Sequence, residues 1–183
     1  MSWLPLALWG ALVGLDATAF PQAMISRPLV AATLTGLLLG RPLEGAVLGA
    51  ILETFALPIL PIGAARYPET GTAAVAATAA YAAATPDFHL PALLLATLFA
   101  LAWEHAAGAS VTLLRRLNER LAGTLPDRPA AGPRDIERRH LAALSLDALR
   151  GATTTLLGAL AGSLLLRTFA AGWTLHPTAP AAA

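Results

Sequence analysis

The chain has 183 residues, of which 56% are hydrophobic and only 13% are charged, with a formal net charge of +1 and a mean hydropathy of +0.64. This composition is too apolar for an ordinary soluble domain, and the near-zero net charge excludes a basic field that would attract nucleic acid. Cysteine is absent, which excludes disulfides and thiolate metal sites. At about 20 residues per membrane crossing, the length accommodates about five to six hydrophobic segments. We therefore predict an all-α, polytopic integral membrane protein in which some segments are short, broken or re-entrant.

The first apolar run, Trp3–Leu15, has the length of a signal-peptide core and is followed by the small residues Ala17-Thr18-Ala19. No Lys or Arg precedes it, however, and another hydrophobic region follows it where a cleaved leader would give way to a polar mature domain. We therefore predict a first membrane helix here. Asp16, directly after the run, is suited equally to a helix-end role and to a ligand role.

Two short apolar runs follow, Leu29–Leu39 and Leu43–Leu57. A straight helix over the first of them, at 1.5 Å per residue, is too short for a hydrocarbon core of about 30 Å. Short segments interrupted by Gly or Pro are typical of broken helices around a transport site. Each run is opened by the same three residue types, Arg27-Pro28-Leu29 and Arg41-Pro42-Leu43. Chance and an internal repeat explain this recurrence equally well.

Three more hydrophobic segments follow along the chain. Thr72–Ala84 consists mostly of small residues, which suits close helix packing better than lipid contact. Leu90–Leu114 is the clearest spanning segment, although it contains Glu104-His105, and Leu141–Ala171 is long enough to span after a polar first turn. Excess Arg in the polar segment 115–139 predicts a cytoplasmic loop. We favour a solvated topology signal for this loop; the alternative is a docking surface for an acidic soluble partner.

The chain is thus expected to have four parts. Residues 1–114 form N-terminal membrane helices with a broken-helix solute site, and residues 115–139 form the Arg-rich cytoplasmic loop. Residues 140–172 form a C-terminal membrane helix, and residues 173–183 form a disordered tail.

The candidate solute site lies in the apolar stretch between residues 22 and 69. Ionisable groups at membrane depth cost at least a few kcal/mol each, so they usually face a cavity, a partner or a substrate. Sugars are bound by amide and carboxylate hydrogen bonds between apolar walls. Gln22, Glu53 and Glu69 have this chemistry, and Arg27 is suited to hold one of the carboxylates. The alternative for each is an ion pair that only satisfies the fold.

Other polar groups in this stretch are assigned lesser roles. Unwound backbone around Pro58, Pro61 and Gly63 is expected to add carbonyl and amide groups to the site. Arg41 and Glu44 flank a turn and are expected to be solvated.

Catalytic and metal-binding patterns are absent from the sequence. There is no phosphate loop, no dinucleotide-binding glycine pattern and no Ser in a nucleophile elbow. The histidines are dispersed, without a second ligand at helical spacing: His89, His105, His140 and His176. We therefore predict no catalytic residue, no metal and no cofactor, and a transport subunit rather than an enzyme acting by itself.

Four short motifs resemble a known family. They are Ser26-Arg27-Pro28-Leu29, Gly36 to Gly40, Gly49 to Glu53 and Ile62-Gly63-Ala64-Ala65. Their order and spacing are similar to the IIC permease component of the mannose–fructose–sorbose phosphotransferase system (PTS). A weaker resemblance continues through Glu104-His105-Ala106, the Arg-rich loop and His140 to Gly151.

The resemblance implies a multi-pass protein of the bacterial inner membrane that translocates a hexose-type sugar for phosphorylation by IIB. It implies a IID membrane subunit, soluble IIA and IIB proteins that relay phosphate from phosphoenolpyruvate through HPr, the lipid bilayer and an oligomeric assembly as partners. By matching position, the sugar site would include Gln22, Arg27, Glu53 and Glu69.

One departure from the family leaves an alternative open. Family members continue for several further helices, so this chain is shortened at its C-terminus relative to them. The alternative function is a non-transporting membrane scaffold that docks soluble PTS proteins for regulation. A third possibility, an unrelated small-solute channel or membrane enzyme, has no positive support in the sequence.

Overall fold

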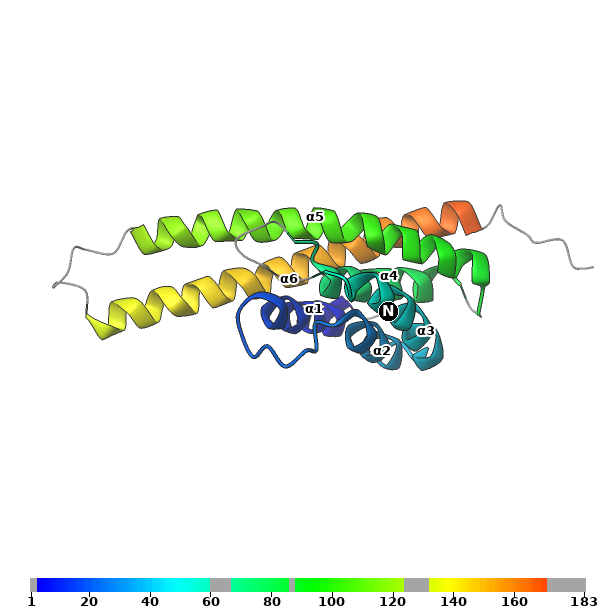
Figure 1. Ribbon diagram of the computed structural model, residues 1–183, viewed down its shortest axis with the longest axis horizontal. Helices are drawn as coiled ribbons and strands as arrows, with labels where there is room; N and C mark the ends of the chain where they lie inside the picture. The colour runs from blue at the N-terminus through cyan, green and yellow to red at the C-terminus, as the bar shows by residue number, and fades with distance from the viewer. Residues whose placement is uncertain (1–2, 60–66, 86–87, 124–131, 171–183) are drawn as a thin grey trace, which may run out of the picture.

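The computed structural model describes residues 3–59, 67–85, 88–123 and 132–170, which form six α-helices and no strand (Figure 1). The helices are α1 (Trp3–Thr18), α2 (Pro28–Leu38), α3 (Pro42–Ala56), α4 (Thr70–Ala84), α5 (Leu90–Gly123) and α6 (Pro133–Ala170). The all-α prediction is confirmed, and each predicted apolar run overlaps a different helix. The two short runs are helices α2 and α3, each of which begins with a proline in its first turn.

The Arg-rich segment differs from its prediction. Because α5 continues to Gly123 and α6 begins at Pro133, the predicted loop over 115–139 is wrong for residues 115–123 and 133–139. Leucine, arginine and glutamate favour helix, and the buried stripe of α5 reaches Leu114, directly before this segment. Nη1 of Arg139 donates to the Leu121 carbonyl at 2.5 Å, which joins the two helices. Together α5 and α6 form a long hairpin, one end of which projects beyond the other helices (Figure 1). This end, residues 115–123 of α5 and 133–139 of α6, is called the α5–α6 tip below.

Helix α4 lies at the centre of the bundle and contacts each of the other five helices described here. All its residues from Gly71 to Tyr81 are buried. Small side chains let neighbouring helices approach closely: a Cβ built on Gly158 or Gly162 of α6 would lie 2.7 or 2.8 Å from an alanine Cβ of α4. The prediction that this segment packs against protein rather than lipid is confirmed.

Arg41 and Glu44 are partly buried, so the prediction that they are solvated is wrong. Their side chains are 15% and 14% exposed, and Nε of Arg41 donates to Oε1 of Glu44 at 2.8 Å. Nη1 of Arg41 donates to the Thr85 carbonyl at 2.5 Å, and its guanidinium lies 5.6 Å from the centre of the Tyr81 ring. The Arg41–Glu44 pair therefore connects the turn between α2 and α3 to the C-terminal end of α4.

The outer faces of the helices are strongly apolar. Helices α5 and α6 are each long and apolar enough to cross a membrane, and α1 and α2 are shorter apolar helices. Many large apolar residues on these faces are each more than half exposed. Such a surface requires an apolar environment. The exposed residues include Leu4, Leu8 and Leu12 of α1, Leu94 and Leu98 of α5, and Leu157, Leu160 and Leu164 of α6.

Candidate functional site

Arg27 and Glu53 form an ion pair that joins the start of α2 to the end of α3. Nε of Arg27 donates to Oε1 of Glu53 at 2.7 Å, and Nη2 contacts the same oxygen. Oε2 accepts the Leu29 amide at 3.2 Å, so Glu53 also satisfies a free N–H in the first turn of α2. The side chain of Arg27 is 41% exposed and that of Glu53 is 17% exposed. Glu53 thus fixes the orientation of an arginine that remains accessible. The expected pairing is present; its role in sugar binding remains a prediction.

Asp16 holds the loop that leads into α2. Its carboxylate accepts the Ala23 amide at 2.5 Å and both the amide and the hydroxyl of Ser26 at 2.8 Å. The structure therefore shows Asp16 in the helix-end role. Gln22 lies in this loop with φ of 58°, in the left-handed region, and its side chain is exposed.

Glu69 is buried at the N-terminus of α4, where its carboxylate accepts the Thr72 amide at 3.4 Å and also the Thr72 hydroxyl. Its Oε2 lies 3.6 Å from Nη1 of Arg150, on α6. Both side chains are less than one-tenth exposed. Glu69 is therefore part of a buried ionic cluster, in which its partner comes from a helix distant in sequence.

Arg150 is the centre of this cluster and connects four helices. Its Nε donates to Oδ1 of Asp147 at 2.9 Å, one turn earlier on α6. Nη2 donates to the Gly14 carbonyl of α1 at 3.3 Å, and Nη1 donates to the Ser110 hydroxyl of α5 at 3.4 Å. With Glu69 on α4, two carboxylates share one guanidinium. Asp147 and Arg150 were not among the residues predicted from the sequence, although their i,i+3 spacing within an apolar helix is a signal of a buried ion pair.

A cavity of about 370 Å³ lies among α1, α4 and α5 and the loop before α2. This volume is within the range of small-molecule sites, about 300–1,000 Å³. Of the predicted site residues, Arg27 and Glu69 line this first cavity, Glu53 contributes by holding Arg27, and Gln22 lies outside the lining. The wall also includes the polar residues Thr18, Ser26, Thr70, Thr112 and Arg115 and the apolar residues Ala56, Ile59, Pro68 and Val111.

Glycines let the polar loops reach this cavity. A Cβ on Gly71 would lie 2.6 Å from the Ser26 carbonyl, and a Cβ on Gly108 would lie 2.4 Å from the Tyr67 carbonyl. Both positions therefore need glycine for close backbone approach. The predicted contribution of Pro61 and Gly63 lies outside the described residues.

Short helices, an apolar exterior and a solute-sized cavity lined by a buried carboxylate and an accessible arginine define a helical membrane protein of the solute-handling class. The chain belongs to the family described as the PTS system sorbose-specific IIC component, whose model matches residues 1–173. The resemblance stated from the sequence motifs is thereby confirmed.

Two curated relatives agree with this family. The chain is 37% identical over 71 residues to the PTS system sorbose-specific EIIC component of Lacticaseibacillus casei, an overlap of 39% of this chain and 25% of the relative. It is 33% identical over 157 residues to the fructose permease IIC component of Bacillus subtilis (strain 168), which covers 85% of this chain and 56% of the relative. The matches thus span about half or less of the relatives' length.

Solved structures show the same fold. One, described as a membrane protein, superposes with a TM-score of 0.76 at 22% identity, covering 96% of this chain and 68% of the other. The other is the cryo-electron microscopy structure of the mannose transporter ManYZ in complex with microcin E492. It superposes with a TM-score of 0.73 at 23% identity, covering 87% of this chain and 62% of the other.

Proposed function

We propose that this chain is a permease subunit (IIC) of a phosphoenolpyruvate-dependent sugar PTS, which binds and translocates a hexose-type sugar for phosphorylation by IIB. The observation that carries the proposal is the first cavity, in which Arg27 and Glu69 face a solute-sized space. Family membership supports the same function. In this proposal the chain crosses the bacterial inner membrane several times, pairs with a IID subunit and meets soluble IIA and IIB at the cytoplasmic side.

The cavity residues have complementary roles toward a sugar. The Arg27 guanidinium has only donors, which suit hydroxyl oxygens, whereas the Glu69 carboxylate accepts hydrogen bonds from hydroxyl groups. Glu53 is a positioning residue because it contacts Arg27 without lining the cavity. Gln22 remains a site residue predicted from the family resemblance alone. No bond is made or broken by the chain in this scheme; it orients the sugar and excludes water.

The direct test is sugar uptake into proteoliposomes that contain this chain, its IID subunit and the soluble IIA and IIB proteins. We expect radiolabelled fructose, sorbose or mannose to accumulate as the phosphate ester when phosphoenolpyruvate, HPr and its kinase are supplied. Vesicles with IID, IIA and IIB but without this chain are the control. Equal uptake in the two preparations would rule out the permease function.

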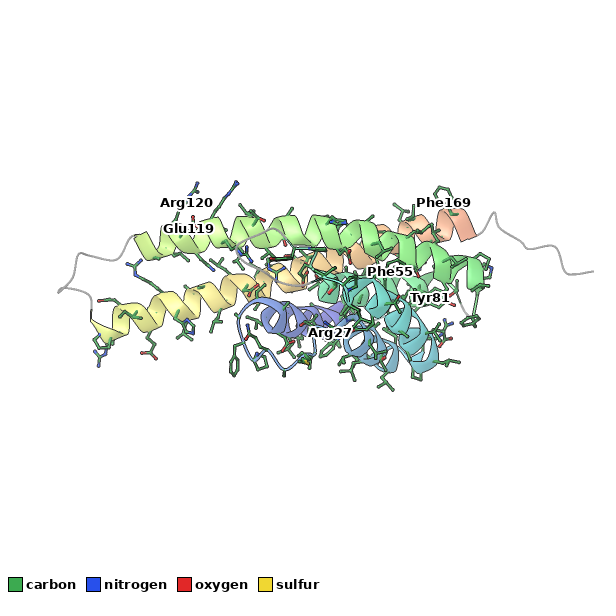
Figure 2. The ribbon with its side chains drawn as sticks, viewed as in Figure 1. Arg27, Phe55, Tyr81, Glu119, Arg120 and Phe169 are labelled. Carbon is green, nitrogen blue, oxygen red and sulfur yellow. The ribbon has the colours of Figure 1, made fainter. Side chains whose placement is uncertain are left out.

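The α5–α6 tip supports a second candidate function, a regulatory scaffold that docks soluble PTS proteins. Exposed arginines lie on both helices of the tip, and Figure 2 shows Glu119 and Arg120 on the part of α5 that projects from the bundle. If this surface docks an acidic partner, replacing Arg116, Arg120, Arg134 and Arg138 by Gln should weaken pull-down of soluble IIB about tenfold, because each exposed charge contact contributes about 0.2–1 kcal/mol.

Two controls show whether IIB binding depends on the positive charge of the tip: the ionic strength, and variants that remove negative charge from the same surface. The wild-type interaction should weaken at high ionic strength, where exposed charges are screened. The matched variants Glu119→Gln and Glu137→Gln, also on the tip, should bind IIB at least as well as the wild type. Undiminished binding by the arginine variants would exclude the docking surface. A scaffold that binds IIB yet supports no uptake would favour the second function over the first.

A further inference from the structure

A second cavity, of about 340 Å³, lies beside the first and nearer to the α5–α6 tip. Its walls come from the end of α1 and from the facing sides of α5 and α6. The polar lining includes Asn118, His140 and Asp147, and the apolar lining includes Leu114 and Leu144. Amide, imidazole and carboxylate groups between apolar walls are the chemistry that holds a polyhydroxylated solute.

The two cavities meet along a common wall. Ala17 and Thr18 at the end of α1, and Val111 and Arg115 on α5, line both of them. The two cavities are therefore adjacent, with only these side chains between them.

The Thr18 hydroxyl on this wall has two acceptors and one proton. It lies 3.0 Å from the Gly14 carbonyl and also within hydrogen-bond distance of Oδ2 of Asp147. If a solute hydroxyl replaces Thr18 at Asp147, the Thr18 proton can turn to Gly14. No buried donor is left unsatisfied, so the exchange avoids the usual desolvation penalty of about 1–3 kcal/mol.

Arg150 connects the two cavities electrostatically. Its Nε lies 2.9 Å from Oδ1 of Asp147, a residue that lines the second cavity. Its Nη1 lies 3.6 Å from Oε2 of Glu69, a residue that lines the first cavity. Each cavity thus has one buried carboxylate paired with the same guanidinium.

We propose that the second cavity is a second sugar subsite, in which Asp147 accepts hydrogen bonds from sugar hydroxyls. The two cavities are then successive positions of one sugar on its way to the α5–α6 tip. This inference rests on the proposed function, because it takes the solute of the first cavity to be a sugar.

Single cysteines introduced into this cysteine-free chain test the subsite. Thr112→Cys lies in the first cavity only, Ala143→Cys lies in the second only, and the exposed Ala142→Cys lies in neither. The rate at which each thiol forms a mixed disulfide with a water-soluble thiosulfonate, releasing sulfinate, is measured on the full chain in nanodiscs, with and without fructose, sorbose or mannose. Sugar at about ten times its Kd leaves about a tenth of the sites free, so labelling inside an occupied cavity should slow about tenfold.

We expect protection of the Thr112→Cys and Ala143→Cys variants and none of the Ala142→Cys variant. Adding Asp147→Asn should abolish protection of Ala143→Cys and preserve that of Thr112→Cys. Protection of Thr112→Cys alone in the otherwise wild-type chain would overturn the second subsite while leaving the proposed function intact. Loss of both protections with Asp147→Asn would also overturn it, since one sugar would then span both cavities. Absence of protection at both cavities would contradict sugar binding itself.

A second variant avoids the ionic cluster. Ala143→Phe places a phenyl ring in the second cavity, which partly fills it, and leaves the Asp147 and Arg150 side chains unchanged. It should retain sugar protection of Thr112→Cys while uptake in proteoliposomes falls. Normal uptake by the filled variant would overturn the second subsite.

Discussion

Replacing Arg150 by Met is expected to destabilise the protein by about 3–5 kcal/mol, because removing one partner of a buried ion pair leaves uncompensated charge. The side chain of Arg150 is 6% exposed and lies against Asp147 and Glu69, which are both 4% exposed. Without the guanidinium, two buried carboxylates would repel each other. Unfolding in detergent, followed by tryptophan fluorescence against increasing denaturant, measures the change.

Two further variants show whether charge is the cause. Arg134→Met removes an exposed arginine from the same helix and should leave stability close to that of the wild type. Combining Arg150→Met with Asp147→Asn and Glu69→Gln removes the whole ionic set, and should recover much of the loss because buried ion clusters are often replaceable as a unit. Wild-type stability of the single Arg150→Met variant would show that the cluster does not stabilise the fold.

Replacing Glu53 by Gln is expected to lower sugar uptake about 10- to 100-fold while the chain still inserts into the membrane. In the structure the Glu53 carboxylate serves Arg27 with one oxygen and the Leu29 amide with the other. A glutamine has only one acceptor oxygen and no charge, so Arg27 would lose its fixed position in the cavity wall. Hydrogen bonds to charged groups contribute about 1.5–3 kcal/mol, which corresponds to the expected change in uptake.

Glu44→Gln is the matched control for this change. Glu44 is also on α3 and also pairs with an arginine, Arg41, but neither residue lines either cavity. The control should keep most of its uptake. Uptake is normalised to the amount of monodisperse protein extracted from membranes. A Glu53→Gln variant that inserts and transports normally, or that fails to accumulate, would reduce the Arg27–Glu53 pair to a structural role.

The sequence alone determined the helices, because helix formation in apolar segments depends on local signals. Pro28 and Pro42 begin the two short helices, and the run of small residues at Thr72–Ala84 predicted the packed central helix α4. The sequence also placed Arg27 with a carboxylate and indicated the family. It failed at residues 115–123 and 133–139, where Arg-rich polarity was interpreted as a loop although leucine, arginine and glutamate favour helix.

Only the tertiary structure decided which charged groups meet. Glu69 and Arg150 are distant in the sequence, and their contact depends on the rotation and crossing of α4 and α6. The same packing put Glu53 behind Arg27, left Gln22 outside the cavity and buried Asp147. The physical reason is that apolar periodicity predicts which face of a helix is buried but not which helix packs against that face. The partner across an interface is set by close packing between helices, which no local stretch of sequence specifies.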